Sequence, residues 1–266
     1  MNKIIFTKMV ASGNDFIVIR GRPSGNLRGL AKLLCNRKFG IGADGMLLLS
    51  KCKGADLCMR IFNADGSEPS MCGNGARCAA LFSGKKNARL LTAAGVINTQ
   101  VCGKQVKIRL TEPKGIKLNI PLKVNGRLIK VNFINTGVPH VVIFVNGIDK
   151  LNVVSIGRII RYHKKFAPAG TNVNFVEEKS GNLIAIRTYE RGVEDETLAC
   201  GTGSTAAALI FALKNNLDNL IKVHTQSGEV LKVFFEKNNF QKEKGKFNQV
   251  MLEGSAKIVY KGEYYV

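Results

Sequence analysis

Two cysteines stand in the same unusual setting in a chain of 266 residues. Cys72 and Cys200 each open the pattern Cys-Gly-x-Gly, and an alanine-rich stretch typical of a helix follows each of them. Backbone N–H groups at a helix start lack partners within the helix, and the aligned peptide dipoles add partial positive charge there. Such a site favours a carboxylate ligand and raises the thiolate fraction of a nearby cysteine. Each pattern therefore offers a thiol that can act as a base, beside a cradle for a carboxylate.

Two such sites facing each other would suit the inversion of an amino acid at its α-carbon. One cysteine, as thiolate, removes the α-proton, and the other, as thiol, returns a proton to the opposite face. The two helix starts stabilise the charge that develops on the carboxylate. A single cysteine before a helix is more often a small apolar side chain. The repeated setting favours catalysis for Cys72 and Cys200. The apolar interpretation holds for the remaining cysteines, Cys35, Cys52, Cys58, Cys78 and Cys102.

The elements around the two cysteines also repeat. Short segments rich in β-branched and aromatic residues predict strands throughout, among them LIAIRTYE at 183–190, which alternates well. Helices are expected at 27–37, at 154–165 and after each of the two cysteines. Each half thus reads as strands, an outer helix, more strands and then the Cys-Gly-x-Gly helix. Since 128 residues separate Cys72 from Cys200, this pattern predicts an internal duplication.

The boundary between the halves is expected near 112–121. Pro113, Gly115 and Pro121 lie there, and proline and glycine commonly interrupt helices and strands.

The net charge of +21 raises the possibility of nucleic-acid binding. The basic residues are scattered, and no aromatic, base-stacking pattern accompanies the densest cluster, at 158–165. A nucleic-acid partner is therefore unlikely on the sequence. A solvated basic surface, or a field that attracts a small anionic substrate, fits the charge better.

The cysteines and the apolar segments also bear on compartment and metal content. Seven cysteines cannot all pair internally, and no pair of Cys-x-x-Cys motifs suggests zinc. The first apolar run ends before Thr7, too early for a signal-peptide core, and no stretch approaches the roughly 18 apolar residues of a membrane span. We expect a cytoplasmic protein with free thiols, no metal and no membrane association.

Beyond these patterns, the sequence resembles the diaminopimelate epimerase family over nearly its full length. The shared motifs occur in the expected order and together are highly specific. They are SGNDF at 12–16, GIGADG at 40–45, FNADGSE at 62–68, CGNGARC at 72–78, TGVPH at 136–140, GTNVNFV at 170–176, YERGVEDETLACGTG at 189–203 and SGE at 227–229.

The resemblance implies an α+β fold of two pseudo-symmetric domains, each a β-barrel-like mixed sheet around a central helix. Residues 1–117, completed by a final strand at 256–266, would form the N-terminal domain, and residues 118–255 the C-terminal domain. The implied reaction interconverts LL- and meso-2,6-diaminopimelate without cofactor or metal, in lysine and peptidoglycan precursor synthesis. A homodimer is implied as well.

The resemblance also implies roles for individual residues. Cys72 and Cys200 would be the acid/base pair, with His140 in support. The implied backbone cradles for the reacting carboxylate are Gly73, Asn74, Gly201 and Thr202. The implied substrate contacts are Asn14, Asn63, Asn172, Glu190 and Arg191. Two contacts known in some family members do not transfer, because this chain has Val138 where they have Asn and Gly45 where they have Gln.

Several of these residues have a plainer interpretation. Arg191 could bind a distal carboxylate through a two-pronged hydrogen bond or be a surface arginine. Asn63, before Ala-Asp-Gly, could simply make a turn. Glu190 could hold an ammonium group, orient His140 or form an ordinary ion pair. His140 could be structural.

Two other functions compete with this assignment. A proline-racemase-like isomerase would share the cysteine pair, whereas a phenazine-pathway-like isomerase would lack it. A basic nucleic-acid-binding module would need neither cysteine.

Overall fold

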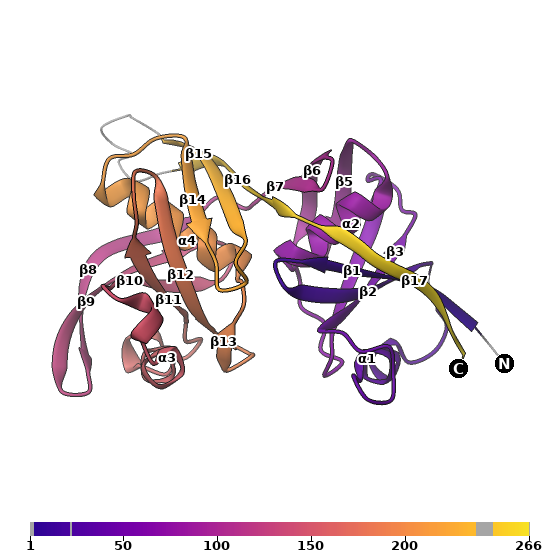
Figure 1. Cartoon of the computed structure of the whole chain (residues 1–266), viewed down its shortest axis with the longest axis horizontal. Coiled ribbons are helices and arrows are strands. Elements are labelled where there is room, and N and C mark those ends of the chain that lie inside the picture. The colour runs from indigo at the N-terminus through magenta and orange to yellow at the C-terminus, as the bar shows by residue number, and fades with distance from the viewer. Residues whose placement is uncertain (1–2, 22, 238–246, 266) are drawn as a thin grey trace. The chain divides into compact units, whose positions relative to one another are not determined.

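The computed structural model describes residues 3–21, 23–237 and 247–265. The chain divides into two compact units, each of which is described by itself (Figure 1). Unit 1 comprises Met1–Arg109 and Gly254–Val266, and unit 2 comprises Leu110–Glu253. The sequence-based division at 117/118 falls inside a strand of unit 2, at 114–124.

The elements of unit 1 are β1 (Lys3–Ala11), β2 (Asn14–Arg20), α1 (Leu27–Cys35), β3 (Gly45–Ser50), β4 (Leu57–Asn63), α2 (Gly73–Ser83), β5 (Asn87–Thr92), β6 (Gly95–Cys102), β7 (Gln105–Arg109) and β17 (Lys257–Tyr265). Those of unit 2 are β8 (Lys114–Val124), β9 (Arg127–Asn135), β10 (Pro139–Phe144), η1 (Ile148–Lys150), α3 (Val153–Arg161), η2 (Lys164–Phe166), β11 (Asn172–Glu178), β12 (Leu183–Glu190), β13 (Asp195–Thr197), α4 (Gly201–Lys214), β14 (Leu220–His224), β15 (Val230–Lys237) and β16 (Phe247–Ser255), whose last two residues belong to unit 1.

The two units share one order of strand pairing. In unit 1, β1/β2 is antiparallel, β2/β3 parallel, β3/β4 antiparallel and β4/β5 parallel, and β5, β6 and β7 form an antiparallel meander. In unit 2, β9/β10 is antiparallel, β10/β11 parallel, β11/β12 antiparallel and β12/β14 parallel, and β14, β15 and β16 form the meander. The α+β fold and the internal duplication predicted from the sequence are confirmed.

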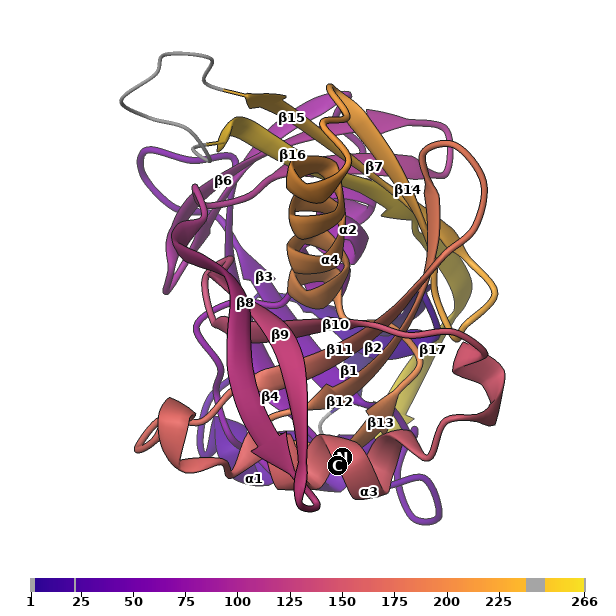
Figure 2. The same cartoon turned by 90° about the vertical axis from the view of Figure 1, so that its left-hand side faces the viewer.

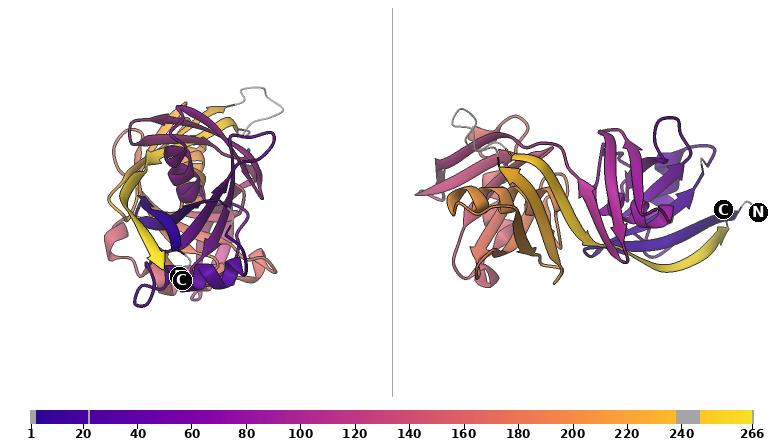
Figure 3. Two further views of the ribbon diagram at one scale, coloured as in Figure 1. Left: turned by 90° about the vertical axis from the view of Figure 1, so that its right-hand side faces the viewer. Right: turned by 90° about the horizontal axis from the view of Figure 1, so that it is seen from above.

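Each unit wraps its strands around one helix. Figure 2 shows α4 enclosed by the strands of unit 2, and the left view of Figure 3 shows α2 enclosed by those of unit 1. Both helices consist mostly of small and apolar residues, although α2 also buries Asn74 and Arg77, and α4 is buried from Gly203 to Ala212. A helix without a polar face has to be buried, and small side chains let strands pack against it from all sides. The sequence therefore places each cysteine at the start of its unit's central helix.

The other two helices lie outside the strands and are amphipathic. α1 packs on β3 and β4, and α3 packs on β11 and β12. Asparagine caps the start of both, through Asn26 and Asn152. The helix expected over residues 27–37 ends at Cys35, because Asn36 takes an extended conformation and its side chain accepts the N–H groups of the next turn. The helix expected over residues 154–165 ends at Arg161, and the 3-10 turn η2 follows.

The punctuated stretch at 112–121 contains the start of a strand rather than a loop. β8 begins at Lys114 and pairs with β9 through Val124, with register shifts on both sides of Lys117. The first irregularity contains Gly115 (φ 65°) and the second contains Asn119 (φ 55°), and both residues take left-handed backbone angles. Over the described ranges, no helix has the length and apolar character needed to cross a membrane.

Candidate active site

Cys72 is the N-cap of α2. Its backbone is extended (φ −142°, ψ 122°), and its Sγ accepts the Gly75 N–H at 3.4 Å. The sulfur therefore lies at the positive end of the helix, where the first N–H groups have no partner within the helix. The side chain is half-buried.

Asn14 brings its side-chain amide to this cysteine from the tight β1–β2 hairpin. Ser12 and Gly13 both take left-handed backbone angles there (φ 51° and 80°), which turns the chain within two residues. Asn14 Oδ1 lies 4.0 Å from Cys72 Sγ, and Asn14 Nδ2 donates to Asp44 Oδ2 at 2.8 Å. The carbonyl end of the amide thus faces the thiol.

Arg77 is a residue of this site that the motif analysis did not single out. Its guanidinium is fully buried in α2, donates to Asn74 Oδ1 at 2.6 Å and to Ser12 Oγ at 2.7 Å, and reaches the Ser255 carbonyl at 3.2 Å. It therefore ties the helix start to the hairpin that carries Asn14. The sequence did hold a clue, because one arginine stands within the small residues of CGNGARC.

Asn63 has the turn-making role that the sequence left open. Its Nδ2 donates to Ser67 Oγ at 2.9 Å, and its backbone N–H donates to the Ser67 carbonyl at 2.9 Å. The side chain is exposed at the end of β4. A contact with substrate stays a prediction.

Cys200 caps α4 in a different manner. Its backbone is also extended (φ −115°, ψ 112°), but among the described contacts its side chain makes no capping hydrogen bond. Instead, Sγ lies 3.4 Å from the Thr202 hydroxyl oxygen. Cys200 is buried, whereas Cys72 is half-buried.

A neutral hydrogen-bonded chain runs from the core of unit 2 to Cys200. Asn174 Nδ2 donates to the Val141 carbonyl at 2.9 Å and lies 3.1 Å from His140 Nδ1, so Nδ1 is the acceptor. The imidazole proton is then on Nε2, which lies 3.0 Å from Thr202 Oγ1. The Thr202 hydroxyl accepts that proton's hydrogen bond and is free to donate its own to Cys200.

Burial keeps the imidazole in this neutral form. Complete burial, aided by the charge of Arg191, lowers the pKa of His140 from 6.5 to about 3. His140 is therefore a hydrogen-bonding member of the site and carries no charge near neutral pH. The sequence left a structural and a functional histidine equally open. The ring makes a structural hydrogen bond to Asn174, and its functional role stays a prediction.

Glu190 is an acidic residue in contact with Cys200. One carboxylate oxygen accepts from the Thr197 hydroxyl at 3.0 Å, and the side chain also shares a hydrogen bond with Cys200. Burial raises the pKa of Glu190, although these two hydrogen bonds oppose the rise. A carboxyl group of this kind can exchange a proton with the thiol beside it.

Asn172 and Arg191 are the remaining candidate site residues of unit 2. The Asn172 amide donates to the Pro139 carbonyl at 3.0 Å and accepts the Arg191 N–H at 2.8 Å, so it links two site segments. Arg191 is half-buried, with one guanidinium nitrogen on the Ala169 carbonyl at 3.0 Å. The structure thus links His140, Thr202 and Glu190 to Cys200 within unit 2, with Arg191 held on Asn172, and it places Asn14 and Asn74 near Cys72 within unit 1.

The glycines of the two helix starts are not equally constrained. A Cβ at Gly203 would lie 2.4 Å from Asn174 Oδ1, so only glycine fits there. At Gly73 the nearest atom would be 3.5 Å away, and at Gly201 it would be 3.0 Å away. Gly45 is also closely confined, since its Cβ would meet the Phe62 carbonyl at 2.9 Å. A glutamine at position 45 would therefore require this strand to shift.

No cluster of three or more His, Cys, Asp or Glu side chains suited to a metal ion occurs in the part of the chain that the structure describes. None of the seven cysteines, all of which are described, forms a disulfide.

Comparisons with known proteins show the family to which the chain belongs. The family model described as diaminopimelate epimerase matches residues 6–115 and 132–257. The chain is 41% identical to the diaminopimelate epimerase of Hydrogenobaculum sp. (strain Y04AAS1), over 97% of this chain and 98% of that protein. It is 42% identical to the diaminopimelate epimerase of Aquifex aeolicus, over 97% and 96% of the two chains.

The chain belongs to the diaminopimelate epimerase family. Family membership makes it an amino-acid epimerase, and so an isomerase. Solved structures of lower identity share the epimerase fold. A Bacillus anthracis phenazine biosynthesis protein of the PhzF family aligns over all of both chains with a TM-score of 0.77 at 19% identity. An Agrobacterium vitis hydroxyproline epimerase aligns over 98% of this chain and 92% of its own, with a TM-score of 0.72 at 15% identity.

Proposed function

We propose that this chain interconverts LL- and meso-2,6-diaminopimelate, with Cys72 and Cys200 as its acid/base pair and without a cofactor. Full-length relatives that carry the name diaminopimelate epimerase support the substrate. The observation that carries the mechanism is the position of the two thiols. Each is the N-cap of the buried central helix of its own unit, so each lies at a helix start with unpaired N–H groups.

The proposed reaction exchanges one proton across the α-carbon. The thiolate of one cysteine removes the α-proton, so that the Cα–H bond breaks and an S–H bond forms. The other cysteine's S–H bond then breaks, and its proton forms a new Cα–H bond on the opposite face. After one turnover the two cysteines have exchanged protonation states. The reverse reaction therefore starts from the state that the forward reaction leaves.

The helix starts stabilise the intermediate charge. Removal of the α-proton pushes electrons onto the carboxylate, and the N–H groups at Gly73, Asn74, Gly201 and Thr202 are the proposed donors to its oxygens. Such preoriented donors provide the largest share of many enzymes' rate enhancement. Within unit 2, the Thr202 hydroxyl is placed to stabilise the Cys200 thiolate, and Glu190 is placed to exchange its proton.

Arg191 is the proposed partner of the distal carboxylate. It lies beside the buried, neutral His140, and its backbone is held by Asn172. An arginine in such a setting can hold a carboxylate through two parallel hydrogen bonds. The remaining assignments follow from the resemblance, and we propose them together: a homodimer in the cytoplasm that supplies meso-diaminopimelate for lysine and peptidoglycan precursors.

The test is solvent-deuterium uptake by the purified chain. LL-diaminopimelate is incubated in D2O with EDTA and a carbonyl trap that removes pyridoxal phosphate. Mass spectrometry follows deuterium at the α-carbon, and chiral chromatography follows the meso isomer. We expect deuterium in the newly formed meso isomer and no exchange with L-lysine, L-proline or trans-4-hydroxy-L-proline. Exchange with proline or hydroxyproline alone would assign a different amino-acid isomerase.

A further inference from the structure

We propose that Asp44 is a positioning residue that fixes which end of the Asn14 side-chain amide faces Cys72. The inference builds on the proposed function, because it concerns the ionisation of one of the two reacting thiols. Asp44 would act on Cys72 through Asn14, whose side-chain amide contacts both residues. It lies just before β3, whereas Asn14 begins β2.

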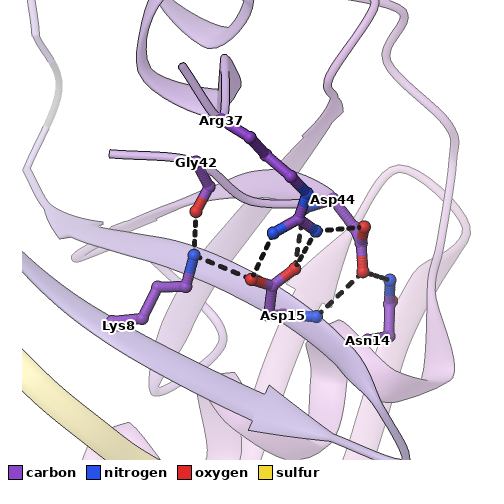
Figure 4. A network of polar contacts seen from close by, with 6 residues as sticks. All are labelled: Lys8, Asn14, Asp15, Arg37, Gly42 and Asp44. Carbon is purple, nitrogen blue, oxygen red and sulfur yellow. Dashed lines mark hydrogen bonds and ion pairs between the residues drawn. The ribbon is translucent and has the colours of Figure 1, made fainter. Parts of the chain in front are cut away.

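The Asp44 carboxylate accepts two N–H groups from the start of β2. Its Oδ2 accepts Asn14 Nδ2 at 2.8 Å and the Asp15 N–H at 3.1 Å (Figure 4). A carboxylate can only accept, so the amide must present its nitrogen to Asp44. The amide oxygen is then left facing Cys72 Sγ at 4.0 Å.

Asp44 is itself held by a charged network. Its Oδ1 accepts Arg37 Nη2 at 2.8 Å, and the same nitrogen donates to Asp15 Oδ1 at 2.9 Å (Figure 4). Asp15 also pairs with the buried Lys8 at 2.8 Å, and Lys8 donates to the Gly42 carbonyl. Although burial opposes ionisation of Asp15, the hydrogen bonds from Arg37 and Lys8 keep its pKa well below the usual range. Asp15 therefore stays ionised near neutral pH and holds Arg37 beside Asp44.

The direction of the Asn14 amide matters for the chemistry of Cys72. An amide oxygen can accept a hydrogen bond from a thiol, but it repels a thiolate. An amide N–H would do the reverse and favour the thiolate. By holding the oxygen toward Cys72, Asp44 favours the thiol form, which donates the proton in one direction of the proposed reaction. Without Asp44 the amide can turn, and the thiolate becomes easier to form.

The Asp44→Ala variant isolates the side chain, because the backbone contacts of Asp44 remain. Its N–H donates to the Asp15 carbonyl, and its carbonyl accepts the Ala64 N–H, both at 3.1 Å. The side chain is 41% exposed, so its removal leaves no buried gap. The matched control is Asp56→Ala, which removes another ion-paired aspartate of unit 1 that accepts a backbone N–H.

The readout is the pH dependence of iodoacetamide alkylation at Cys72 in the full-length protein. Trypsin releases Cys72 in the peptide 61–77, which contains no other cysteine, and Cys78 in the next peptide, 78–85. In Asp44→Ala we expect the midpoint of Cys72 alkylation to fall by about half to one pH unit. Asp56→Ala should leave it unchanged. On LL-diaminopimelate, kcat should fall roughly tenfold in Asp44→Ala.

Two further variants separate positioning from a simple loss of negative charge. In an Asn14→Ala background, Asp44→Ala should no longer move the midpoint, since the amide through which it acts is gone. Arg37→Gln loosens the Asp44 carboxylate but also removes a positive charge. If Asp44 acts by positioning Asn14, the midpoint of Cys72 alkylation should move to lower pH. If only charge matters, it should move to higher pH. Arg37→Gln also serves as the test if Asp44→Ala does not fold.

An unchanged midpoint in Asp44→Ala would overturn the proposal. So would a shift that persists without Asn14, or an upward shift in Arg37→Gln. These outcomes do not depend on epimerase activity. If the wild-type chain failed to epimerise diaminopimelate, the proposed function would fall while the alkylation series still decided the role of Asp44.

Discussion

Cys72 and Cys200 cap equivalent helices, yet their polar neighbours differ in kind. Cys72 faces the carbonyl end of an amide, Asn14, which only accepts hydrogen bonds. Cys200 faces a hydroxyl, Thr202, whose acceptor side is already occupied by His140 and whose proton is available. Asn14 by itself favours the thiol form of Cys72, and Thr202 by itself favours the thiolate form of Cys200. These two neighbours act beside the Gly75 N–H on the first sulfur and Glu190 on the second. The strand order has been kept in both halves, whereas the groups that set the protonation of each thiol have diverged.

The wider networks differ in the same way. Asn14 is hydrogen-bonded to Asp44, which is paired with Arg37, and both of these charged side chains are partly exposed. Thr202 is hydrogen-bonded to His140, which is hydrogen-bonded to Asn174, and both of these neutral side chains are buried. A charged surface network is weakened by salt, and a buried neutral one is not. We call the residues around Cys72 and the residues around Cys200 the two half-sites of the proposed reaction. They should respond differently to salt, pH and substitution.

The largest expected effect comes from removing either thiol. Cys72→Ala and Cys200→Ala should each lower kcat for LL-diaminopimelate by a factor of about 10²–10⁴, because each removes one proton-transfer group. Circular dichroism should show an unchanged fold. The control is Cys78→Ala, which should stay near wild-type activity, since Cys78 is buried in α2 and burial raises its pKa well above the usual range. Full activity in either single variant would show that the two thiols are not a pair.

Arg191→Met should have the next largest effect. Loss of a hydrogen bond to a charged partner is worth about 1.5–3 kcal/mol, which corresponds to roughly a ten- to hundredfold fall in kcat/KM for LL-diaminopimelate. Lysine should restore only part of the loss, because its ammonium lacks the planar fork. An analogue without the distal carboxylate should be turned over equally by wild type and variant.

Arg187→Met is the matched control for that substitution. Arg187 lies in β12 and is paired with Glu196 at 2.7 Å and with the Ile148 and Leu151 carbonyls. Its loss should lower thermal stability without changing the preference between the two substrates. If Arg191→Met lowered activity equally on both, Arg191 would serve the reacting end or the fold.

A smaller effect is expected from Thr202→Val, and it tests the comparison directly. Valine keeps the shape but removes the proton donor to Cys200, so alkylation of Cys200 should require a higher pH. We expect kcat to fall about tenfold. Cys200 is the only cysteine in the tryptic peptide 192–214, so its alkylation can be followed separately from that of Cys72. An unchanged Cys200 midpoint would remove the proposed contrast between the half-sites.

The sequence could predict the frame of this fold but not the orientation of its polar groups. The strand LIAIRTYE has the predicted bounds, because its apolar patterning and flanking residues define it locally. The two central helices also begin where expected, directly after Cys72 and Cys200. The burial of α4 follows from its lack of a polar face, whereas α2 also buries Asn74 and Arg77.

What the sequence could not supply depends on contacts between distant segments. Asn174 could have been predicted as a site residue from the sequence, because it lies two residues after Asn172 in β11 and so points to the same face of the sheet. Its bond to His140, 34 residues away, depends on the parallel pairing of β10 and β11. The contact between Asn14 and Asp44 likewise depends on how β2 and β3 pair. Register across such pairs is a tertiary property, and one segment alone does not encode it.

The smallest expected effect concerns stability in mild acid, and it separates the two units again. His140 has a folded-state pKa of about 3, below its ordinary value of 6.5. Between these values the unfolded chain binds a proton that the folded unit does not. The free energy of unfolding should therefore fall as the pH drops below 6.5, by up to about 1.4 kcal/mol per pH unit for this one group. Asp15 in unit 1 behaves differently, because its pKa is held below the ordinary 3.8, so its contribution is present above that pH and is lost only below it.

Urea unfolding between pH 4.5 and 7.5 checks this difference. His140→Gln keeps a polar partner for Thr202 but cannot titrate, so its stability should fall less steeply below pH 6.5 than that of wild type, while the two slopes should agree above it. Asp15→Asn is the comparison in unit 1, and it should lower stability by the same amount at every pH in this range, because Asp15 stays ionised throughout. Parallel curves for wild type and His140→Gln would mean that His140 takes up its proton in the folded unit. The hydrogen-bonded chain from Asn174 to Cys200 would then be charged at mildly acidic pH. The contrast between a charged network near Cys72 and a neutral one near Cys200 would disappear.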